Sequence, residues 1–304
     1  MQKVIVTGGA GFIGSNLVDE LIAKGIRVII IDDFSTGKKE NINPAVEYCW
    51  EADIYRESVQ DLADFMQYHD IDTIFHLAAL ARVQPSIQDP VQYHNVNVTG
   101  THNLLAAAVE AGVPKFVFSS SSSVYGNAEV PTSEEHELDP MSPYALHKLI
   151  GEQYCKLYST VYDIDTVCLR YFNVYGDRMS LDGAYRLAIP IFATQIKAGK
   201  PCTINNDGEQ RRDYTFVGDV INANIAAATS TKEFNGEVYN VGNGDNVSVN
   251  ELVEMMKGEK SYGYGVIEPN ETLASTAKIN SDLNWKPKGD LRKWINNYME
   301  KING

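Results

Sequence analysis

Cysteine is scarce in this chain of 304 residues, and its few thiols are not spaced as metal or redox ligands. No two of them form a Cys-x-x-Cys pair, which leaves zinc sites and dithiol redox chemistry without a motif. We therefore expect reduced thiols, most of them in the core, and we predict no metal site. The four cysteines are Cys49, Cys155, Cys168 and Cys202.

Positive charge is also in short supply, because 26 Lys and Arg face 40 Asp and Glu and the net charge is −14. Such a surface argues against non-specific binding to nucleic acid or to an anionic membrane. The sequence has no signal-peptide pattern and no apolar run of transmembrane length, about 20 residues. We therefore expect a cytosolic protein. Its hydrophobic residues make up 44% of the sequence, which is enough to build a core.

Strand and helix patterns alternate over the first part of the chain. The runs "IRVIIID", "DTIFHLAA", "KFVFSS" and "DTVCLRYFN" are apolar without alternation, as in strands that are covered on both faces. Helical spacing of apolar residues falls between them, near residues 57–68, 90–111 and 143–162. This order predicts an α/β fold with a Rossmann doubly wound parallel sheet.

The alternation ends after Asn173, where short strand and helix candidates follow in a less regular order. This change predicts a smaller, mixed α/β substrate-binding lobe at the C-terminal end. We predict a cofactor-binding Rossmann domain over residues 1–172, with an interleaved return near 211–240, and the lobe mainly over 173–304.

The stretch "TGGAGFIG" places Gly8, Gly11 and Gly14 between a strand and a helix. Glycine permits the tight turn and close backbone approach that a dinucleotide needs, and the helix N-terminus attracts the pyrophosphate. Asp32 ends the second strand, where a carboxylate accepts the ribose hydroxyl groups of NAD and repels the extra phosphate of NADP. NAD is therefore the predicted cofactor, and the neighbouring Asp33 leaves open which acid binds the ribose.

A tyrosine, a lysine and a run of serines follow at a spacing that suits proton transfer. Tyr144 and Lys148 are four residues apart in an expected helix and share one face, and serines 119–123 end the preceding strand. A free phenol is a poor base at neutral pH, but a nearby ammonium and an oxidised nicotinamide lower its pKa. The arrangement predicts removal of an alcohol proton while a hydride passes to NAD.

Seven stretches together resemble the extended short-chain dehydrogenase/reductase family, and within it the NAD-dependent nucleotide-sugar epimerases and dehydratases. The resemblance covers residues 3–285 and is greatest to UDP-glucose and UDP-N-acetylglucosamine 4-epimerases. The stretches are "TGGAGFIG", "HLAA", "NVNVTGT", "SSSSSVYG", "SPYALHK", "LRYFNVYG" and "RRDYTFVGDV".

The resemblance implies that Ser121 supplies the catalytic hydroxyl group, with Ser122 as the alternative. It implies that Tyr144 is the base and that Lys148 assists it and holds the nicotinamide ribose. Related dehydratases carry an Asp-Glu pair where this chain has Ser122 and Ser123, and related decarboxylases carry a glutamate at Ser123. The serine-rich version is similar to 4-epimerases, which keep NAD bound and use it without net redox.

The resemblance also implies the ligand contacts, with Arg211 as the alternative to Arg212. Asp53 with Ile54 also fits a helix cap, and Asn173 also fits a turn. The cofactor-binding candidates are Gly8, Gly11, Phe12, Ile13, Gly14, Asp32, Asp33, Ser35, Thr36, Gly37, Asp53, Ile54, Leu77, Ala78, Ala79, Ala81, Asn97, Ser119, Tyr144, Lys148, Tyr171 and Val174. The substrate-binding candidates are Arg82, Ser121, Ser122, Tyr144, Asn173, Ala188, Ile189, Thr203, Ile204, Asn205, Arg212 and Glu268.

The favoured substrates are UDP-N-acetylglucosamine and UDP-N-acetylgalactosamine, followed by UDP-glucose and UDP-galactose. "SLDGAYRLAIP" and the small Thr272 are similar to the N-acetylhexosamine branch of the family. Arg82 could face the diphosphate or a sugar carboxylate, which keeps UDP-glucuronate open. Gly265 stands where the family carries a phosphate-binding arginine, and the segment 249–270 is short, which implies a trimmed lid over the nucleotide.

Two other functions remain open. One is a nucleotide-sugar oxidoreductase that consumes or releases its cofactor, and the other is a non-enzymatic dinucleotide-binding protein. The latter would be expected to lose the serine, tyrosine or lysine, and this chain keeps all three. The resemblance also implies a homodimer, in which the helix ending near Ala111 and the helix carrying Tyr144 pair with their mates.

Overall fold

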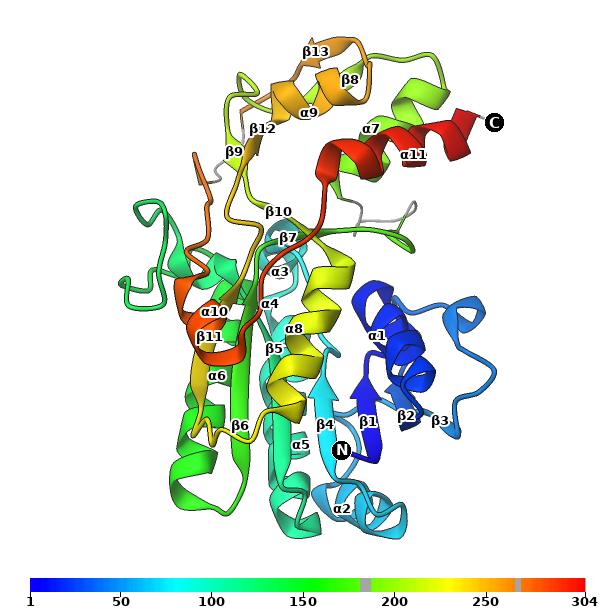
Figure 1. The fold of residues 1–304 in the computed structure, drawn as a ribbon, viewed down its shortest axis with the longest axis vertical. Coiled ribbons are helices and arrows are strands. Elements are labelled where there is room, and N and C mark those ends of the chain that lie inside the picture. The colour runs from blue at the N-terminus through cyan, green and yellow to red at the C-terminus, as the bar shows by residue number, and fades with distance from the viewer. Residues whose placement is uncertain (181–186, 266–268, 304) are drawn as a thin grey trace. The chain divides into compact units, whose positions relative to one another are not determined.

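The computed structural model describes residues 1–180, 187–265 and 269–303 (Figure 1). The chain divides into two compact units. Besides its late segments, unit 2 includes an early loop, residues 125–139, which no sequence pattern indicated. Unit 1 comprises Met1–Val124, Pro140–Arg170 and Ile221–Tyr239, and unit 2 comprises Tyr125–Asp139, Tyr171–Val220 and Asn240–Gly304.

Unit 1 is built on a seven-stranded sheet with the order β11-β6-β5-β4-β1-β2-β3. β1 pairs in parallel with β2 and β4, and these pair in parallel with β3 and β5. The chain order therefore reverses beside β1, which is where doubly wound sheets bind ligands at the carboxyl ends of their strands. The predicted Rossmann-type α/β fold is confirmed. The strands are β1 Lys3–Thr7, β2 Arg27–Asp32, β3 Tyr48–Glu51, β4 Thr73–His76, β5 Lys115–Ser121, β6 Asp165–Tyr171 and β11 Glu237–Val241.

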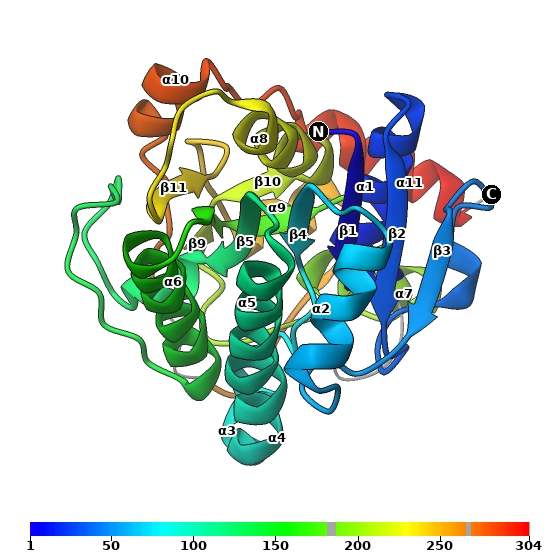
Figure 2. The same cartoon turned by 90° about the horizontal axis from the view of Figure 1, so that it is seen from below.

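Helices cover both faces of this sheet (Figures 1 and 2). Helices α2, α5 and α6 lie on one face, and α1 and α8 lie on the other. The central strands are mainly apolar because both faces of the sheet are covered, and every residue of β1 is buried. The helices are α1 Phe12–Ala23, α2 Val59–Tyr68, α3 Val83–Gln88, α4 Pro90–His94, α5 Gly100–Ala111, α6 Pro143–Val161 and α8 Val217–Thr229.

The single helix predicted over residues 90–111 is two helices, α4 and α5, joined by a π-helical turn at Asn95–Thr99. Within this turn, the Asn97 side chain accepts the N–H of Leu80 at 2.8 Å and donates to its carbonyl at 2.9 Å. Such turns are frequent at functional sites, and this one holds the loop that follows β4. Helix α3 was not predicted, because its six residues are too few to show a helical period.

Unit 2 contains three small sheets of two strands each within its described residues. The buried carboxylate of Asp213 links its segments by accepting the N–H groups of Asn243 at 2.7 Å, Gly244 at 3.0 Å and Ala274 at 3.0 Å. The strand pairs are β7 Asn173–Tyr175 with β10 Tyr214–Phe216, β9 Arg211–Arg212 with β12 Val247–Ser248, and β8 Cys202–Ile204 with β13 Lys260–Tyr262. Its helices include α7 Ala188–Lys197, α9 Val249–Met255, α10 Ala277–Leu283 and α11 Leu291–Asn303.

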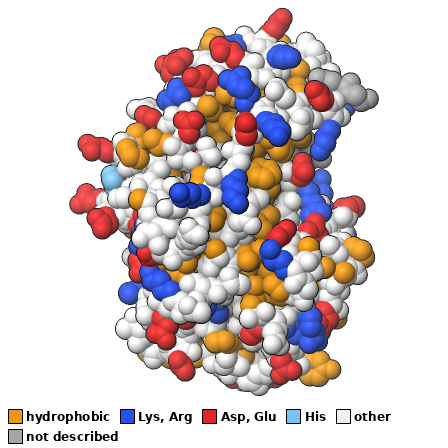
Figure 3. All heavy atoms as spheres, viewed as in Figure 1, with side chains coloured by type: hydrophobic (Ala, Val, Ile, Leu, Met, Phe, Trp, Pro, Cys, Tyr) orange, Lys and Arg blue, Asp and Glu red, His pale blue; other side chains and the backbone are white. Residues whose placement is uncertain are grey.

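Acidic and basic side chains are interspersed on the face shown in Figure 3. Within the described ranges, no helix combines the length and the apolar character needed to span a membrane.

Replacement of Gly151 by alanine tests how tightly α6 packs on the sheet. A Cβ at this position would lie 2.3 Å from Cζ of Phe118, a ring of β5 that is itself fully buried. Alanine improves helix propensity by about 1 kcal/mol, but overpacking of a filled core costs about 1–3 kcal/mol and should outweigh it. We expect a lower denaturant midpoint for Gly151→Ala. The exposed Leu157→Ala in the same helix should change the midpoint little, and an unchanged midpoint for Gly151→Ala would contradict this packing.

Candidate active site

The glycine-rich loop after β1 lies against the end of β4. Gly8 has φ +69°, and a Cβ there would lie 2.8 Å from the amide nitrogen of Ala78. A Cβ on Gly14 would lie 2.1 Å from the carbonyl oxygen of Gly8. No side chain caps the start of α1 at Gly11, so its first-turn amides can bind a pyrophosphate. The loop therefore fits the dinucleotide role expected of it.

Asp32 and Asp33 have different hydrogen-bond partners. The buried Asp32 carboxylate accepts the N–H of Ala10 and the N–H of Phe34, both at 2.9 Å. Asp33 accepts the N–H of Ser35 at 2.9 Å and its hydroxyl group at 2.7 Å, which closes a local turn. Asp32 is therefore oriented by the glycine-rich loop and is the better candidate for the ribose. Burial raises the pKa of Asp32, and the two N–H groups oppose that rise.

Asp53 does not cap the helix that follows it. Helix α2 begins at Val59, and the Ser58 side chain caps it by accepting the N–H of Asp61. The helix-cap alternative for Asp53 is therefore wrong, since its carboxylate instead accepts the N–H of Tyr55 at 3.3 Å.

The end of β4 is held by a buried network that the sequence did not reveal. The Thr7 hydroxyl oxygen accepts the N–H groups of Leu77 and Ala78 at 3.2 Å and bonds Nδ1 of His76 at 2.8 Å. Nε2 of the same ring bonds the Thr101 hydroxyl at 2.8 Å. Burial lowers the pKa of His76 to about 3, so the ring is neutral. Through Thr7, the His76 ring positions the backbone of the candidate cofactor-binding residues that follow β4.

The three candidate catalytic residues come together in unit 1. Ser121 ends β5, Tyr144 lies in the first turn of α6, and its side chain is hydrogen-bonded to that of Ser121. One turn later, Nζ of Lys148 donates to the Ser119 carbonyl at 2.7 Å and lies 5.9 Å from the centre of the Tyr144 ring. Helix α6 begins here because Ser142 caps it by accepting the N–H of Ala145 at 3.2 Å.

Burial dominates the ionisation of both residues on α6. It raises the pKa of Tyr144, against the Ser121 hydrogen bond and the positive charge of Arg82. It lowers the pKa of Lys148 to about 8, against the negative charge of Glu152. The positive charge that opposes this rise in the pKa of Tyr144 is that of Arg82, whereas the sequence predicted that Lys148 would supply it. Ser121, not Ser122, is the serine bonded to Tyr144, which favours the first of the two candidates.

A buried ion pair, which the sequence analysis did not predict, supports this arrangement of Ser121, Tyr144 and Lys148. Glu152, one turn beyond Lys148, accepts from Nε of Arg170 at 2.8 Å and from its terminal nitrogen at 2.6 Å. The Ser120 hydroxyl donates to the same carboxylate at 2.5 Å. The i+4 spacing from Lys148 was the available signal for Glu152, but the partner on β6 could not be inferred.

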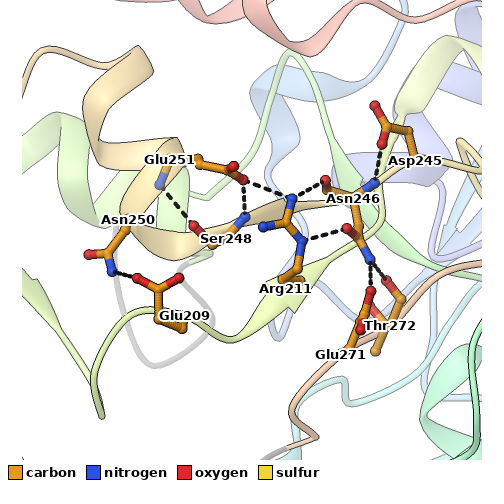
Figure 4. Close-up of polar contacts among 9 residues, drawn as sticks. All are labelled: Glu209, Arg211, Asp245, Asn246, Ser248, Asn250, Glu251, Glu271 and Thr272. Atoms are coloured by element: carbon orange, nitrogen blue, oxygen red, sulfur yellow. Dashed lines mark hydrogen bonds and ion pairs between the residues drawn. The ribbon is translucent and has the colours of Figure 1, made fainter.

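Unit 2 separates the roles of the two neighbouring arginines. Figure 4 shows Arg211 held by Asn246 and Glu251. Its Nε donates to the Asn246 side chain at 2.7 Å, and it pairs with Glu251 at 2.9 Å. Arg212 is almost fully buried and donates to the Arg211 carbonyl at 2.9 Å. Arg211 is thus committed to the scaffold of unit 2, and Arg212 remains the phosphate-binding candidate that the resemblance implies.

The other substrate candidates divide between the units. Ile189 and Ile204 are 1% and 0% exposed, so neither presents a surface to a ligand in this structure. The Thr203 hydroxyl accepts from Gln195 at 3.0 Å. Glu268 lies outside the described residues. Unit 1 holds Arg82, Ser121, Ser122 and Tyr144, and unit 2 holds Asn173, Ala188, Ile189, Thr203, Ile204, Asn205 and Arg212.

Proteins of known family are similar to this chain over most of its length. The model of the NAD dependent epimerase/dehydratase family matches residues 4–242. A putative UDP-glucose 4-epimerase of Methanocaldococcus jannaschii is 38% identical over 99% of both chains. Two solved structures cover 97–99% of both chains. UDP-N-acetylglucosamine 4-epimerase of Methanobrevibacter ruminantium, in complex with UDP-N-acetylmuramic acid, has a TM-score of 0.91 at 35% identity. UDP-glucuronic acid 4-epimerase of Bacillus cereus, in complex with UDP-glucuronic acid and NAD, has a TM-score of 0.90 at 33% identity.

Alanine replacements of Asp32 and Asp33 test which of these two residues binds the ribose hydroxyl groups. Asp32→Ala should weaken NAD binding by about 10-fold or more and reduce the preference for NAD over NADP, because charge-assisted hydrogen bonds are lost. Asp33→Ala is the matched control and should change that preference much less. Cofactor affinities of the cofactor-free variants give the comparison. A larger effect at Asp33 would move the ribose contact there.

Proposed function

The chain belongs to the NAD dependent epimerase/dehydratase family, and on that premise we propose that it is a UDP-sugar 4-epimerase. The observation that carries the proposal is the contact between Tyr144 and Ser121, one helical turn from Lys148. NAD is the cofactor, and when bound it accepts the hydride of carbon 4 and later returns it. The glycine-rich loop and Asp32 fit its pyrophosphate and ribose.

Proton transfer is the task of the residues in unit 1. The phenolate of Tyr144 takes the proton of the sugar 4-hydroxyl group while the Ser121 hydroxyl group binds the same oxygen. Lys148 holds the nicotinamide ribose. After rotation of the 4-keto sugar, Tyr144 would return the proton to the oxygen of carbon 4, whose configuration is then inverted. Substrate and product therefore differ only at carbon 4, and no net redox occurs.

The residues after Ser121 support epimerisation over elimination. A dehydratase needs a carboxylic acid beside the sugar to expel water, and this chain has Ser122 and Ser123 there. Glu152 is a buried carboxylate that contacts the end of β5, but it already binds Ser120 and Arg170. This carboxylate is therefore committed to its two partners and is not placed to protonate a leaving hydroxyl group of the sugar.

The N-acetylhexosamine substrates remain the favoured pair, with UDP-glucose and UDP-galactose next. The support is the likeness of "SLDGAYRLAIP" to that branch, of which residues 181–186 lie outside the described ranges. Thr272 is a small residue whose hydroxyl oxygen accepts the N–H of Asp213 at 3.2 Å. UDP-glucuronate is the alternative, since the relatives are named for all three sugars.

Proton NMR of the purified protein tests the proposal without added cofactor. UDP-N-acetylglucosamine, UDP-glucose and UDP-glucuronate are supplied separately, and the signal of the product inverted at carbon 4 is followed. Conversion of one of them would establish epimerisation with retained NAD and identify the sugar. Absence of product from all three, with NAD supplied as well, would reject the epimerase and favour an oxidoreductase.

Removal of the Tyr144 hydroxyl group tests the assigned base. Tyr144→Phe should lower kcat by about 10²–10⁴-fold, the usual contribution of a general base, and leave the affinity for UDP unchanged. Tyr162→Phe, at the exposed end of the same helix, is the matched control and should retain kcat. If Tyr144→Phe turns over at the normal rate, Tyr144 is not the base.

A further inference from the structure

Arg82 has a backbone conformation that only glycine adopts readily. Its φ is +101° and its ψ is 136°, in the residue that immediately precedes α3. A side chain in this region of φ and ψ costs free energy and persists only where the surrounding structure enforces it. Strain of this kind clusters at functional sites, which suggests that the position of the Arg82 side chain has a function.

Hydrogen bonds on both sides hold the strained residue in place. On its amino side, Asn97 binds both backbone groups of Leu80, and the Tyr93 hydroxyl donates to the Ala81 carbonyl at 2.8 Å. On its carboxyl side, the Ser86 hydroxyl oxygen of α3 accepts the N–H of Tyr144 at 3.2 Å. The backbone around Arg82 is therefore tied to the first turn of α6, which carries the candidate base.

Arg82 is partly buried, and its charge acts on Tyr144 and on Tyr93, among its other interactions. Tyr144 also contacts Ser121 of β5 and lies near Lys148 of its own helix. Arg82 therefore supplies a second cation, from the loop that follows β4. Nζ of Lys148 donates to the Ser119 carbonyl, and its pKa is lowered to about 8. The lysine therefore loses its charge in mildly alkaline solution, whereas a guanidinium keeps its charge.

We propose that Arg82 is a positioning residue for the base, and that its guanidinium stabilises the phenolate of Tyr144. The inference rests on the proposed function, because that reaction requires the phenolate. It assigns Arg82 a role different from binding the diphosphate or a sugar carboxylate. It also accounts for the strained backbone, since the loop holds a permanent cation near a phenol whose charged form is disfavoured by burial.

The test compares Arg82→Gly with Arg82→Lys. Glycine removes the charge and suits the positive φ, so Arg82→Gly should melt no lower than the wild type. Lysine keeps a cation in the same loop. Arg27→Met is the control, because Arg27 is exposed at the amino end of β2, the opposite end of the sheet. The measurements are the pH profile of kcat, the affinity for UDP, and an ultraviolet difference titration of tyrosinate against Tyr144→Phe in the NAD-loaded protein.

Loss of the cation should raise the pKa of Tyr144, because its phenolate loses a stabilising charge. The acidic limb of the kcat profile should therefore move to higher pH by about 1 unit in Arg82→Gly, an effect typical of a nearby opposite charge. Arg82→Lys should restore most of the shift, and UDP affinity should be unchanged in both. The control should match the wild type.

Two results would overturn the proposal. An unmoved acidic limb in folded Arg82→Gly would remove Arg82 from the ionisation of Tyr144. Weaker UDP binding with an unmoved limb would assign Arg82 to the substrate instead. If no UDP-sugar is epimerised, the tyrosinate titration still decides the matter. A raised Tyr144 pKa in Arg82→Gly would uphold the electrostatic role even where the proposed reaction fails, and an unchanged pKa would refute it.

Discussion

The buried ion pair between Glu152 and Arg170 fixes the point where β5, α6 and β6 meet. Two hydrogen bonds from the guanidinium and one from Ser120 satisfy the carboxylate, so its charge is tolerated at 4% exposure. Ser120 precedes Ser121, and Glu152 follows Lys148 by one helical turn. The same contact therefore joins the strand end and the helix that carry Ser121 and Lys148. Removal of either partner would leave a buried charge unpaired, which is more damaging than the loss of a surface ion pair.

Burial around this ion pair also controls which groups carry charge. It keeps His76 neutral, lowers the pKa of Lys148 to about 8 and raises that of Tyr144. A phenol that must act as a base is thus placed where its charged form is disfavoured. Hydrogen bonding to Ser121 and the charge of Arg82 act in the opposite direction. The base is consequently governed by a few nearby dipoles and charges, whose effect is large because water is excluded.

The cofactor side of the unit depends on close backbone approach. The loop at Gly8 lies against Ala78, and the Asp32 carboxylate is oriented by amide groups of the loops on either side of it. These contacts place a helix N-terminus and one acid at the carboxyl edge of the sheet, where parallel strands converge. Unit 2 is organised differently, around the buried Asp213, and its Arg211 serves the scaffold that Figure 4 shows.

The sequence by itself determined the fold class, the family and the cofactor, because glycine spacing, apolar strands and the tyrosine–lysine pair are local patterns. It left open Ser121 against Ser122 and Asp32 against Asp33, and it did not indicate the roles of His76 or the Glu152–Arg170 pair. Only the tertiary structure distinguishes these neighbours, since they differ in their contacts with other strands and helices. Adjacent residues look alike in sequence, but their side chains meet different partners once the chain is folded.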